Sequence, residues 1–198
     1  RARRVSRPRY CSPEAARADK GRRAPTPKQI IHAQQEERND IDEQQRRFPA
    51  VVDGNLWLIF NGEIFNHAAI RPALEAAGHR YANRSDSETI IHAYEQFGAD
   101  SVRHFRGMFA FAIWDNRARR LFLARDRLGK KPLHYATMAD GSLYFSSELS
   151  SFAAVPGLER RVAATAVDDF FTYGYIPDPG TIYDSIRKLP AAHFLKLD

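Results

Sequence analysis

Short apolar runs, separated by polar turns that often contain glycine, recur along the chain after its first quarter. The first run, residues 56–60, has five apolar residues in a row, which is too short for a helix and typical of a buried strand. Two helices are predicted next, each followed by a glycine. Asn66 is expected to cap the first, which runs to Ala77. Ser85 and Glu88 form a capping box at the start of the second.

Four antiparallel strands in one meander are predicted in the middle of the chain, at residues 108–114, 121–124, 132–136 and 143–147. These runs are apolar on both faces, as in a sheet that another layer covers. Two short helices and a last strand are predicted after them, at residues 147–154, 163–173 and 192–197. This order of helices and antiparallel strands predicts an α+β layered sandwich.

Length and composition agree with one domain, with or without appendages. The chain has 198 residues, 43% of them hydrophobic and thirteen of them phenylalanine, which is ample for a core. No apolar run reaches the roughly 18 residues of a membrane span, and no signal-peptide pattern opens the chain. The single cysteine, Cys11, excludes an intramolecular disulfide and a cysteine-rich zinc site. We expect a cytoplasmic protein with no membrane partner and no metal site.

The net charge of +6 comes entirely from the first quarter of the chain. Residues 1–48 contain 13 Lys and Arg against 7 Asp and Glu, whereas residues 49–198 contain 17 of each. With almost no large apolar residues, the first segment cannot bury enough surface to offset its ordering entropy. We interpret it as disordered or non-native. The alternative is a basic arm that binds nucleic acid, but no aromatic residues are interleaved with the charges, so we expect no nucleic-acid partner.

Asn61 and Gly62 directly follow the first predicted strand, and two structures fit them. Asn-Gly between apolar runs is the strongest short signal for a type I′ hairpin turn. Ile64 and Phe65 oppose a hairpin, because two residues are too few to pair with a strand of five. In the other interpretation, the strand brings an amide side chain and a glycine N–H to one place, as an oxyanion hole requires. The spacing alone leaves both structures open.

Asp86 lies inside the capping box but has no part in it. The simpler explanation is that the helix dipole favours a carboxylate in the first turn. The functional alternative is a carboxylate that holds the ammonium group of a substrate.

Five stretches in order carry a resemblance to a known family. They are residues 60–66 (Phe-Asn-Gly-Glu-Ile-Phe-Asn), 85–88 (Ser-Asp-Ser-Glu), 105–115 (Phe-Arg-Gly-Met-Phe-Ala-Phe-Ala-Ile-Trp-Asp), 124–135 (Ala-Arg-Asp-Arg-Leu-Gly-Lys-Lys-Pro-Leu-His-Tyr) and 145–148 (Phe-Ser-Ser-Glu). Together they resemble the glutaminase domain of glutamine-hydrolysing asparagine synthetases, the class II glutamine amidotransferases. Residues 49–198 are assigned to this domain. Residues 174–198, which include Tyr-Gly-Tyr-Ile-Pro and Lys-Leu-Pro sequences, resemble the strip that leads into a synthetase domain.

The resemblance implies an N-terminal-nucleophile (Ntn) hydrolase-type αββα sandwich of antiparallel sheets that releases ammonia from glutamine. An N-terminal cysteine thiolate would be the nucleophile, with its own α-amine as the base. Asn61 and Gly62 match the oxyanion hole, Glu63 a residue that contacts glutamine, and Asp86 the residue that holds its α-ammonium group. The implied partners are glutamine, a synthetase domain in which ATP and Mg²⁺ activate aspartate, and a second copy of the chain in a homodimer.

Residues 1–48 depart from the family pattern. They contain no Met-Cys-Gly-Ile start, and Cys11 has ten residues before it, so its nitrogen is a peptide nitrogen. Arg46 and Arg47 are poor substitutes for the arginine that grips the substrate carboxylate. No pyrophosphate loop of a synthetase follows, so we expect no cofactor in this chain.

These departures predict an incomplete domain. We expect a glutaminase domain that lacks its first strands, preceded by a segment of the kind that a reading-frame shift would produce. Such a chain should be poorly stable by itself, because missing strands expose sheet edges, and it should be inactive in glutamine hydrolysis. The alternative function is a degenerate glutaminase fold that serves as a non-catalytic interaction module.

Overall fold

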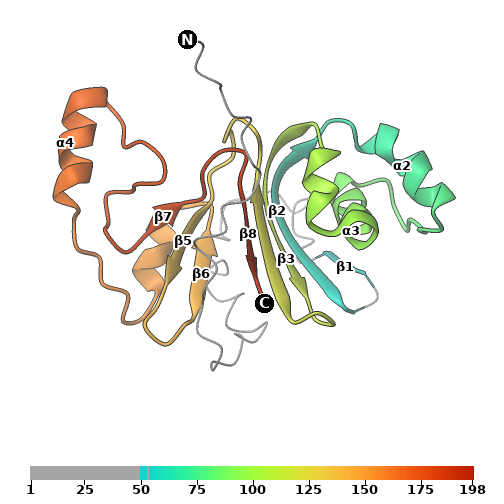
Figure 1. Cartoon of the computed structure of the whole chain (residues 1–198), viewed down its shortest axis with the longest axis horizontal. Helices are drawn as coiled ribbons and strands as arrows, with labels where there is room; N and C mark the ends of the chain where they lie inside the picture. Colours follow the sequence, from blue (N-terminus) through green and yellow to red (C-terminus); the bar gives the residue numbers. More distant parts are fainter. Residues whose placement is uncertain (1–49, 53) are drawn as a thin grey trace, which may run out of the picture.

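The computed structural model describes residues 50–52 and 54–198. Two antiparallel sheets pack face to face, with helices at the outside (Figure 1). The strands of the large sheet lie in the order β1 (Ala50–Val52), β2 (Leu56–Ile64), β3 (Gly107–Asp115), β4 (Arg120–Arg125) and β8 (Phe194–Leu197). Those of the small sheet lie in the order β6 (Leu143–Ser146), β5 (His134–Thr137) and β7 (Arg187–Lys188).

Helices α2 (His67–Ala76) and α3 (Asp86–Phe97) lie on one side of the large sheet, and the 3₁₀ helix η4 (Gly98–Arg103) continues α3 (Figure 1). Buried aromatic rings fill the space between helices and sheet, among them Phe105, Phe109, Phe111 and Phe122. Helix α3 is the main cover, because it buries residues on several of its turns, whereas α2 buries only Leu74.

A second core lies between the two sheets, where Trp114 and Leu123 of the large sheet meet Leu143 and Phe145 of the small one. A third lies on the other face of the small sheet and includes Phe152 of the 3₁₀ helix η5 (Ser150–Ala154). The layers therefore follow the order helices, sheet, sheet, helical turn. The predicted α+β class with antiparallel sheets is confirmed.

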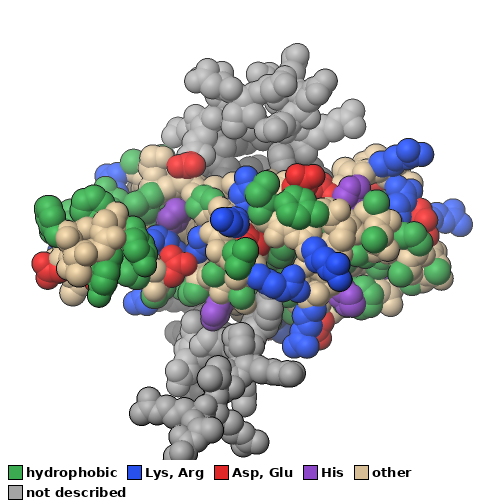
Figure 2. Space-filling view, turned by 90° about the horizontal axis from the view of Figure 1, so that it is seen from above, with side chains coloured by type: hydrophobic (Ala, Val, Ile, Leu, Met, Phe, Trp, Pro, Cys, Tyr) green, Lys and Arg blue, Asp and Glu red, His purple; other side chains and the backbone are tan. Residues whose placement is uncertain are grey.

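Helix α4 (Ala164–Tyr173) forms where the sequence predicts it, but it does not pack as a layer on the small sheet. Its one buried residue is Ala166. Phe171 is 83% exposed, and Phe170 and Tyr173 are also exposed. In Figure 2, hydrophobic side chains gather at the left end of the molecule, where Figure 1 places α4. The helical cover of the small sheet comes instead from η5.

The end predicted for the first strand is wrong, and so is the hairpin alternative. Strand β2 does not stop at Phe60 but continues to Ile64. Asn61 pairs with Ala110 and Gly62 with Phe109, both in β3. Polar residues interrupt the apolar run, but β3 supplies a partner along all nine residues, so pairing overrides the local turn signal.

The single four-stranded meander is also wrong. β3 pairs with β4 and β5 pairs with β6, as expected, but β4 pairs with β8 instead of β5. The chain leaves the large sheet after Arg125 and enters the small one at His134. Because all four runs are apolar on both faces, their pattern cannot show that they belong to two stacked sheets.

The two predicted helix caps differ in outcome. The side chain of Asn66 does not cap α2 but bonds the segment before β3, accepting from Arg106 N at 2.7 Å and donating to His104 O at 2.9 Å. Ser85 does cap α3, accepting from Glu88 N at 3.3 Å. The return bond of the capping box is absent among the described residues, because the Glu88 carboxylate accepts from the N–H groups of Ala82 and Asn83 instead.

In the part of the chain that the structure describes, none of the helices combines the length and the apolar character needed to cross a bilayer.

Candidate functional site

Asn61 lies near the carboxyl end of β2. Its neighbours in the alternating pattern, Trp57 and Ile59, pack against the core between the sheets, so the Asn61 side chain also faces the small sheet. There its amide Nδ2 donates a hydrogen bond to Ser147 Oγ at 3.1 Å, directly after β6. An amide nitrogen carries two N–H donors, and this bond uses one of them. The contact fixes the orientation of the amide and leaves its second donor for another acceptor.

His134 supports Ser147 from β5. Its Nδ1 lies 3.1 Å from Ser147 O, and because a carbonyl only accepts, Nδ1 carries the proton in this contact. Burial lowers the pKa of His134, the bond to Ser147 opposes that shift, and the positive charge of Lys188 adds to it. The neutral imidazole is therefore favoured, with Nε2 as its acceptor nitrogen.

Gly62 occupies a position that admits no side chain. Its φ is 135°, and an added Cβ would lie 2.0 Å from Met108 O. Phe65 N donates to Arg106 O, and antiparallel bonds alternate, so the N–H groups of Gly62 and Ile64 point away from β3. They lie on the same outer edge of β2.

Asp86 joins that edge. It is the first residue of α3 and half-buried, and its Oδ2 accepts from Ile64 N at 3.0 Å. Asp86 therefore has a hydrogen-bond partner in the fold, although its position in the sequence gave it no part in the capping box. Its second oxygen, Oδ1, has no hydrogen bond among the described residues and is available to a donor from a ligand.

Glu63 lies between these groups with an exposed side chain. The alternation of the strand puts this side chain on the same side of β2 as that of Asn61. Its backbone oxygen is closely packed, because a Cβ on Gly107 would lie 2.1 Å from it. Two glycines, Gly62 and Gly107, thus allow β2 and β3 to approach closely at this end.

All four residues predicted for the site lie at one end of β2 or touch it, three of them in β2 and Asp86 in the helix bonded to it. Cys11, Arg46 and Arg47 lie outside the described residues. Two neighbours were missed, Ser147 and His134. Both fall inside stretches that carry the family resemblance, but nothing in their spacing relates them to Asn61.

A second cluster of polar bonds lies at the turn of residues 126–131 after β4, where Asp126 also contacts β3. The Asp126 carboxylate accepts backbone N–H groups at 3.0–3.2 Å, from Phe109, Leu128, Lys130 and Lys131. Arg125 next to it is buried and donates to three carbonyls, those of Gly129, Lys131 and Leu189, and to Asp178 at 2.9 Å. These bonds hold the connection between the two sheets in place. Because Asp126 and Arg125 use their acceptors and donors within the protein, they are poorly suited to bind a ligand.

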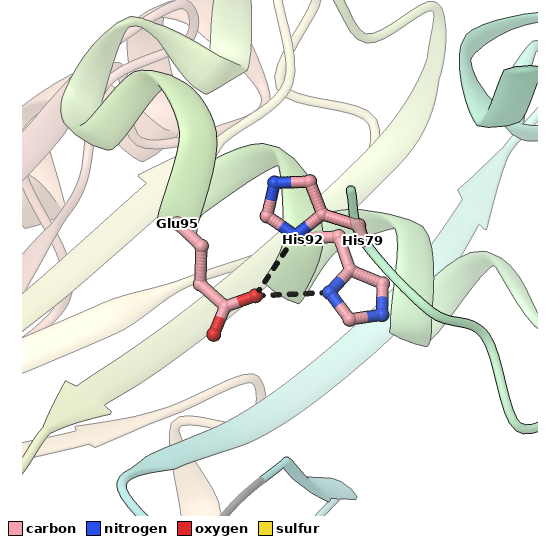
Figure 3. A group of neighbouring side chains, drawn as sticks. All are labelled: His79, His92 and Glu95. Atoms are coloured by element: carbon pink, nitrogen blue, oxygen red, sulfur yellow. Dashed lines mark hydrogen bonds and ion pairs between the residues drawn. The ribbon is translucent and has the colours of Figure 1, made fainter. Parts of the chain in front are cut away.

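The described residues contain one group suited to a metal ion, away from the end of β2: His79, His92 and Glu95. Their ligand atoms lie within 4.8 Å of one another (Figure 3). Only His92 and Glu95 share a helix, and His79 comes from the segment after α2, which is why the sequence pattern did not reveal the group.

A surface depression of about 370 Å³ lies at the opposite end of β2, lined in part by Asn55, Leu56, Arg117 and Arg120. None of the four predicted site residues lines it. It is therefore separate from the group at Asn61.

Comparisons with known proteins give a consistent result. A family model described as a glutamine amidotransferase domain matches residues 40–198. Asparagine synthetase (glutamine-hydrolyzing) 3 of Bacillus subtilis is 37% identical over 158 residues, which cover 79% of this chain and 26% of the relative. Asparagine synthetase (glutamine-hydrolyzing) 1 of the same organism is 34% identical over 143 residues, with 72% and 22% covered. The chain spans about a quarter of the length of these curated relatives.

Among solved structures, the glutamine phosphoribosylpyrophosphate amidotransferase of Bacillus subtilis, complexed with ADP and GMP, matches with a TM-score of 0.46 and 27% identity. The match covers 58% of this chain and 27% of that chain.

Proposed function

Because the chain belongs to the glutamine amidotransferase domain family, we propose that it is the glutaminase part of a glutamine-hydrolysing asparagine synthetase. In this proposal the end of β2 binds glutamine, and the ammonia released from it serves a synthetase domain outside the 198 residues. ATP, Mg²⁺ and aspartate would bind to that domain and not to this one. A cytoplasmic location and a homodimer are further parts of the proposal.

The main support for this proposal is the contact between the start of α3 and the outer edge of β2. Asp86 Oδ2 accepts from Ile64 N at 3.0 Å at the outer edge of β2, the edge to which strand alternation also assigns the N–H of Gly62. The other oxygen of Asp86 has no hydrogen bond among the described residues. An ammonium group is the donor that best suits a carboxylate oxygen, because a charge-assisted hydrogen bond is stronger than a neutral one. A molecule that has both an ammonium group and an amide carbonyl, as glutamine has, fits this pair of groups.

The chemistry assigned to Asn61 and Gly62 is stabilisation of a negative oxygen. Attack on the side-chain amide of glutamine converts its carbonyl oxygen into an oxyanion. The second N–H of the Asn61 amide and the N–H of Gly62 would donate to it. Ser147 is a positioning residue in this scheme, because it holds the Asn61 amide at 3.1 Å and so sets the direction of the second N–H.

The nucleophile remains a prediction from the resemblance, an N-terminal cysteine with its own α-amine as the base. Cys11, the one cysteine in the sequence, lies outside the described part. Stoichiometric alkylation of Cys11 by a glutamine-like diazo-ketone would identify this thiol as the nucleophile, and absence of labelling would exclude it.

Glutamine binding tests the proposal without requiring the nucleophile. Calorimetric titration of the whole chain with L-glutamine should give saturable binding, and D-glutamine and L-asparagine should bind more weakly. Asp86→Asn should weaken binding, while the exposed Asp168→Ala on α4 serves as a matched control and should not. If L-glutamine shows no saturable binding, or if Asp168→Ala weakens it as much as Asp86→Asn, the proposed site is wrong.

A further inference from the structure

His79, His92 and Glu95 direct three ligand atoms toward one point beside α3 (Figure 3). The two histidine Nδ1 atoms both approach the same oxygen of Glu95, His92 Nδ1 at 2.9 Å and His79 Nδ1 at 3.4 Å. His92 and Glu95 are three residues apart in α3 and share a face of the helix, and His79 reaches them from the segment after α2. We propose that these side chains bind a divalent transition-metal ion, with Zn²⁺ as the best match.

The spacing of the ligand atoms suits such an ion. Zn²⁺ binds histidine nitrogen and carboxylate oxygen at about 2.0–2.2 Å in tetrahedral geometry, which places neighbouring ligand atoms roughly 3.3 Å apart. The two nitrogen-to-oxygen distances of 2.9 and 3.4 Å lie on either side of that value. Two histidines with one glutamate form a common zinc ligand set, with the fourth position open to water. Mg²⁺ and Ca²⁺, which prefer oxygen ligands, suit this group poorly.

The second nitrogen of His79 is placed as a metal-bound histidine requires. When Nδ1 binds a metal, the proton resides on Nε2, and that N–H usually donates to a carboxylate or another oxygen. His79 Nε2 lies 3.1 Å from Gln96 Oε1. His92 Nε2 lies 3.8 Å from Glu88 Oε1, which is beyond hydrogen-bonding distance.

One buried nitrogen of the group has no partner. His92 Nε2 is buried, lies 3.8 Å from Glu88 Oε1 and makes no hydrogen bond among the described residues. A buried polar atom without a partner calls for an explanation, and a bound ion that holds the ring through Nδ1 supplies one.

The charges near the group also favour a cation. Glu95 and Glu88 place two carboxylates around the imidazoles. Arg71 of α2 is occupied elsewhere, bonded to Glu75 at 2.7 Å and stacked 4.3 Å from the centre of the Tyr81 ring. Arg80, which follows His79 in the sequence, is exposed. The Tyr81 ring in turn meets that of His92, with centroids 4.6 Å apart, and so encloses the buried side of the group.

A bound ion would connect two parts of the chain that lie on either side of Asp86 in the sequence. His79 lies at the start of the connection from α2 to α3, and Asp86 lies at the end of that connection. The ion would fasten the connection to the face of α3 that carries Glu95. It is assigned a binding role here, independent of glutamine hydrolysis.

The test is a calorimetric titration of the untagged chain with ZnCl₂ after dialysis against a chelator. Cys11→Ser is introduced throughout to remove the thiol as a competing ligand. One Zn²⁺ per chain is expected, and MgCl₂ should give no comparable binding. Absence of saturable binding at one ion per chain overturns the proposal.

Variants of the exposed and half-exposed members identify the ligands, since the buried His92 would also affect folding. Gln96→Ala removes only the partner of His79 Nε2 and should lower Zn²⁺ affinity about 10–100-fold. His79→Gln and Glu95→Gln should lower it at least as much, whereas the exposed His104→Gln, outside the group, should not change it. Equal affinity in His79→Gln, Glu95→Gln and His104→Gln overturns the assignment.

Thermal unfolding separates loss of binding from loss of fold. Zn²⁺ should raise the unfolding midpoint of the parent chain and of His104→Gln, because a ligand that binds only the folded state stabilises it. His79→Gln and Glu95→Gln should unfold near the metal-free parent midpoint and should not respond to Zn²⁺. A full response in either of these two variants contradicts the proposed ligand set.

Discussion

Asp86 and Asp126 both attach a backbone segment to the end of a strand, but they use their oxygens differently. Asp126 is 1% exposed, and its two oxygens accept four backbone N–H groups. Asp86 is half-buried and accepts one, from Ile64, which leaves Oδ1 free among the described residues. Both lie in stretches that carry the family resemblance.

The difference shows what separates a structural carboxylate from one that can bind a ligand. A carboxylate offers about four acceptor directions, and at Asp126 backbone groups occupy as many. A ligand could bind there only by displacing a bond that holds the turn of residues 126–131. At Asp86 a ligand can bind to the free oxygen while the bond to Ile64 remains. The number of unused acceptor directions therefore distinguishes the two residues.

The largest effect is expected for Asp126→Ala. The change leaves several buried N–H groups without an acceptor, each of which costs about 1–3 kcal/mol. We expect the free energy of unfolding to fall by roughly 4 kcal/mol or more, a large part of the total for a domain. Urea unfolding measures the loss, with the exposed Asp168→Ala as the control. Similar stability in the two variants would show that the bonds of Asp126 do not stabilise the fold.

Gly62→Ala tests whether the close approach of β2 to β3 at Gly62 is needed for stability. The new Cβ would lie 2.0 Å from Met108 O on a backbone with φ of 135°, so the β2–β3 pairing must shift. A destabilisation of about 2–4 kcal/mol is expected, in the range of severe local strain.

Gly174→Ala is the matched control for Gly62→Ala. Gly174 also has a positive φ, 76°, in the left-handed region, but no atom beyond its neighbours in the chain lies within 4 Å of an added Cβ. Only the conformational cost of about 1–2 kcal/mol remains. Equal losses in the two variants would show that φ alone, and not the close approach to Met108, limits position 62.

Asp86→Asn tests whether the Asp86 carboxylate binds the ammonium group of glutamine. The variant loses a charge-assisted bond to the ammonium group, worth about 1.5–3 kcal/mol, so the dissociation constant for L-glutamine should rise about 10–150-fold. The free energy of unfolding should change by less than about 1 kcal/mol, because only the bond to Ile64 and the helix-dipole interaction weaken. Calorimetric titration and urea unfolding measure the two quantities. A lowered stability with unchanged glutamine binding would decide for a purely structural role.

The smallest effect concerns His134, which supports the Ser147 contact. Burial lowers its pKa in the folded state below the ordinary value of 6.5. As the pH falls from above 6.5 towards that lowered pKa, the unfolded chain binds a proton that the folded chain does not, so stability falls. His134→Gln should make this decline shallower. Urea unfolding at several pH values between about 7.5 and 5 measures the slope, and an equal slope in His134→Gln and the parent chain would contradict the prediction.

Much of the fold could be predicted because its elements have clear local patterns. The nine-residue strand β3 and the helix α3 with its Ser85 cap form where apolar periodicity and capping chemistry place them. Strand pairing was harder to predict. The runs that became β4 and β5 are apolar on both faces, so nothing local shows that one pairs with β8 and the other with β7.

For the candidate site, the residue types could be selected from the amino-acid sequence. Asn61, Gly62, Glu63 and Asp86 could be selected because an amide, a glycine and carboxylates in that order suit the chemistry of an oxyanion and an ammonium group. Their neighbours depend on the folding of the whole chain. Asp86 meets Ile64 N across 22 positions and Asn61 meets Ser147 across 86, and His79 joins His92 and Glu95 from another segment. Periodicity specifies which face of an element is buried, but contacts between elements depend on how whole layers stack.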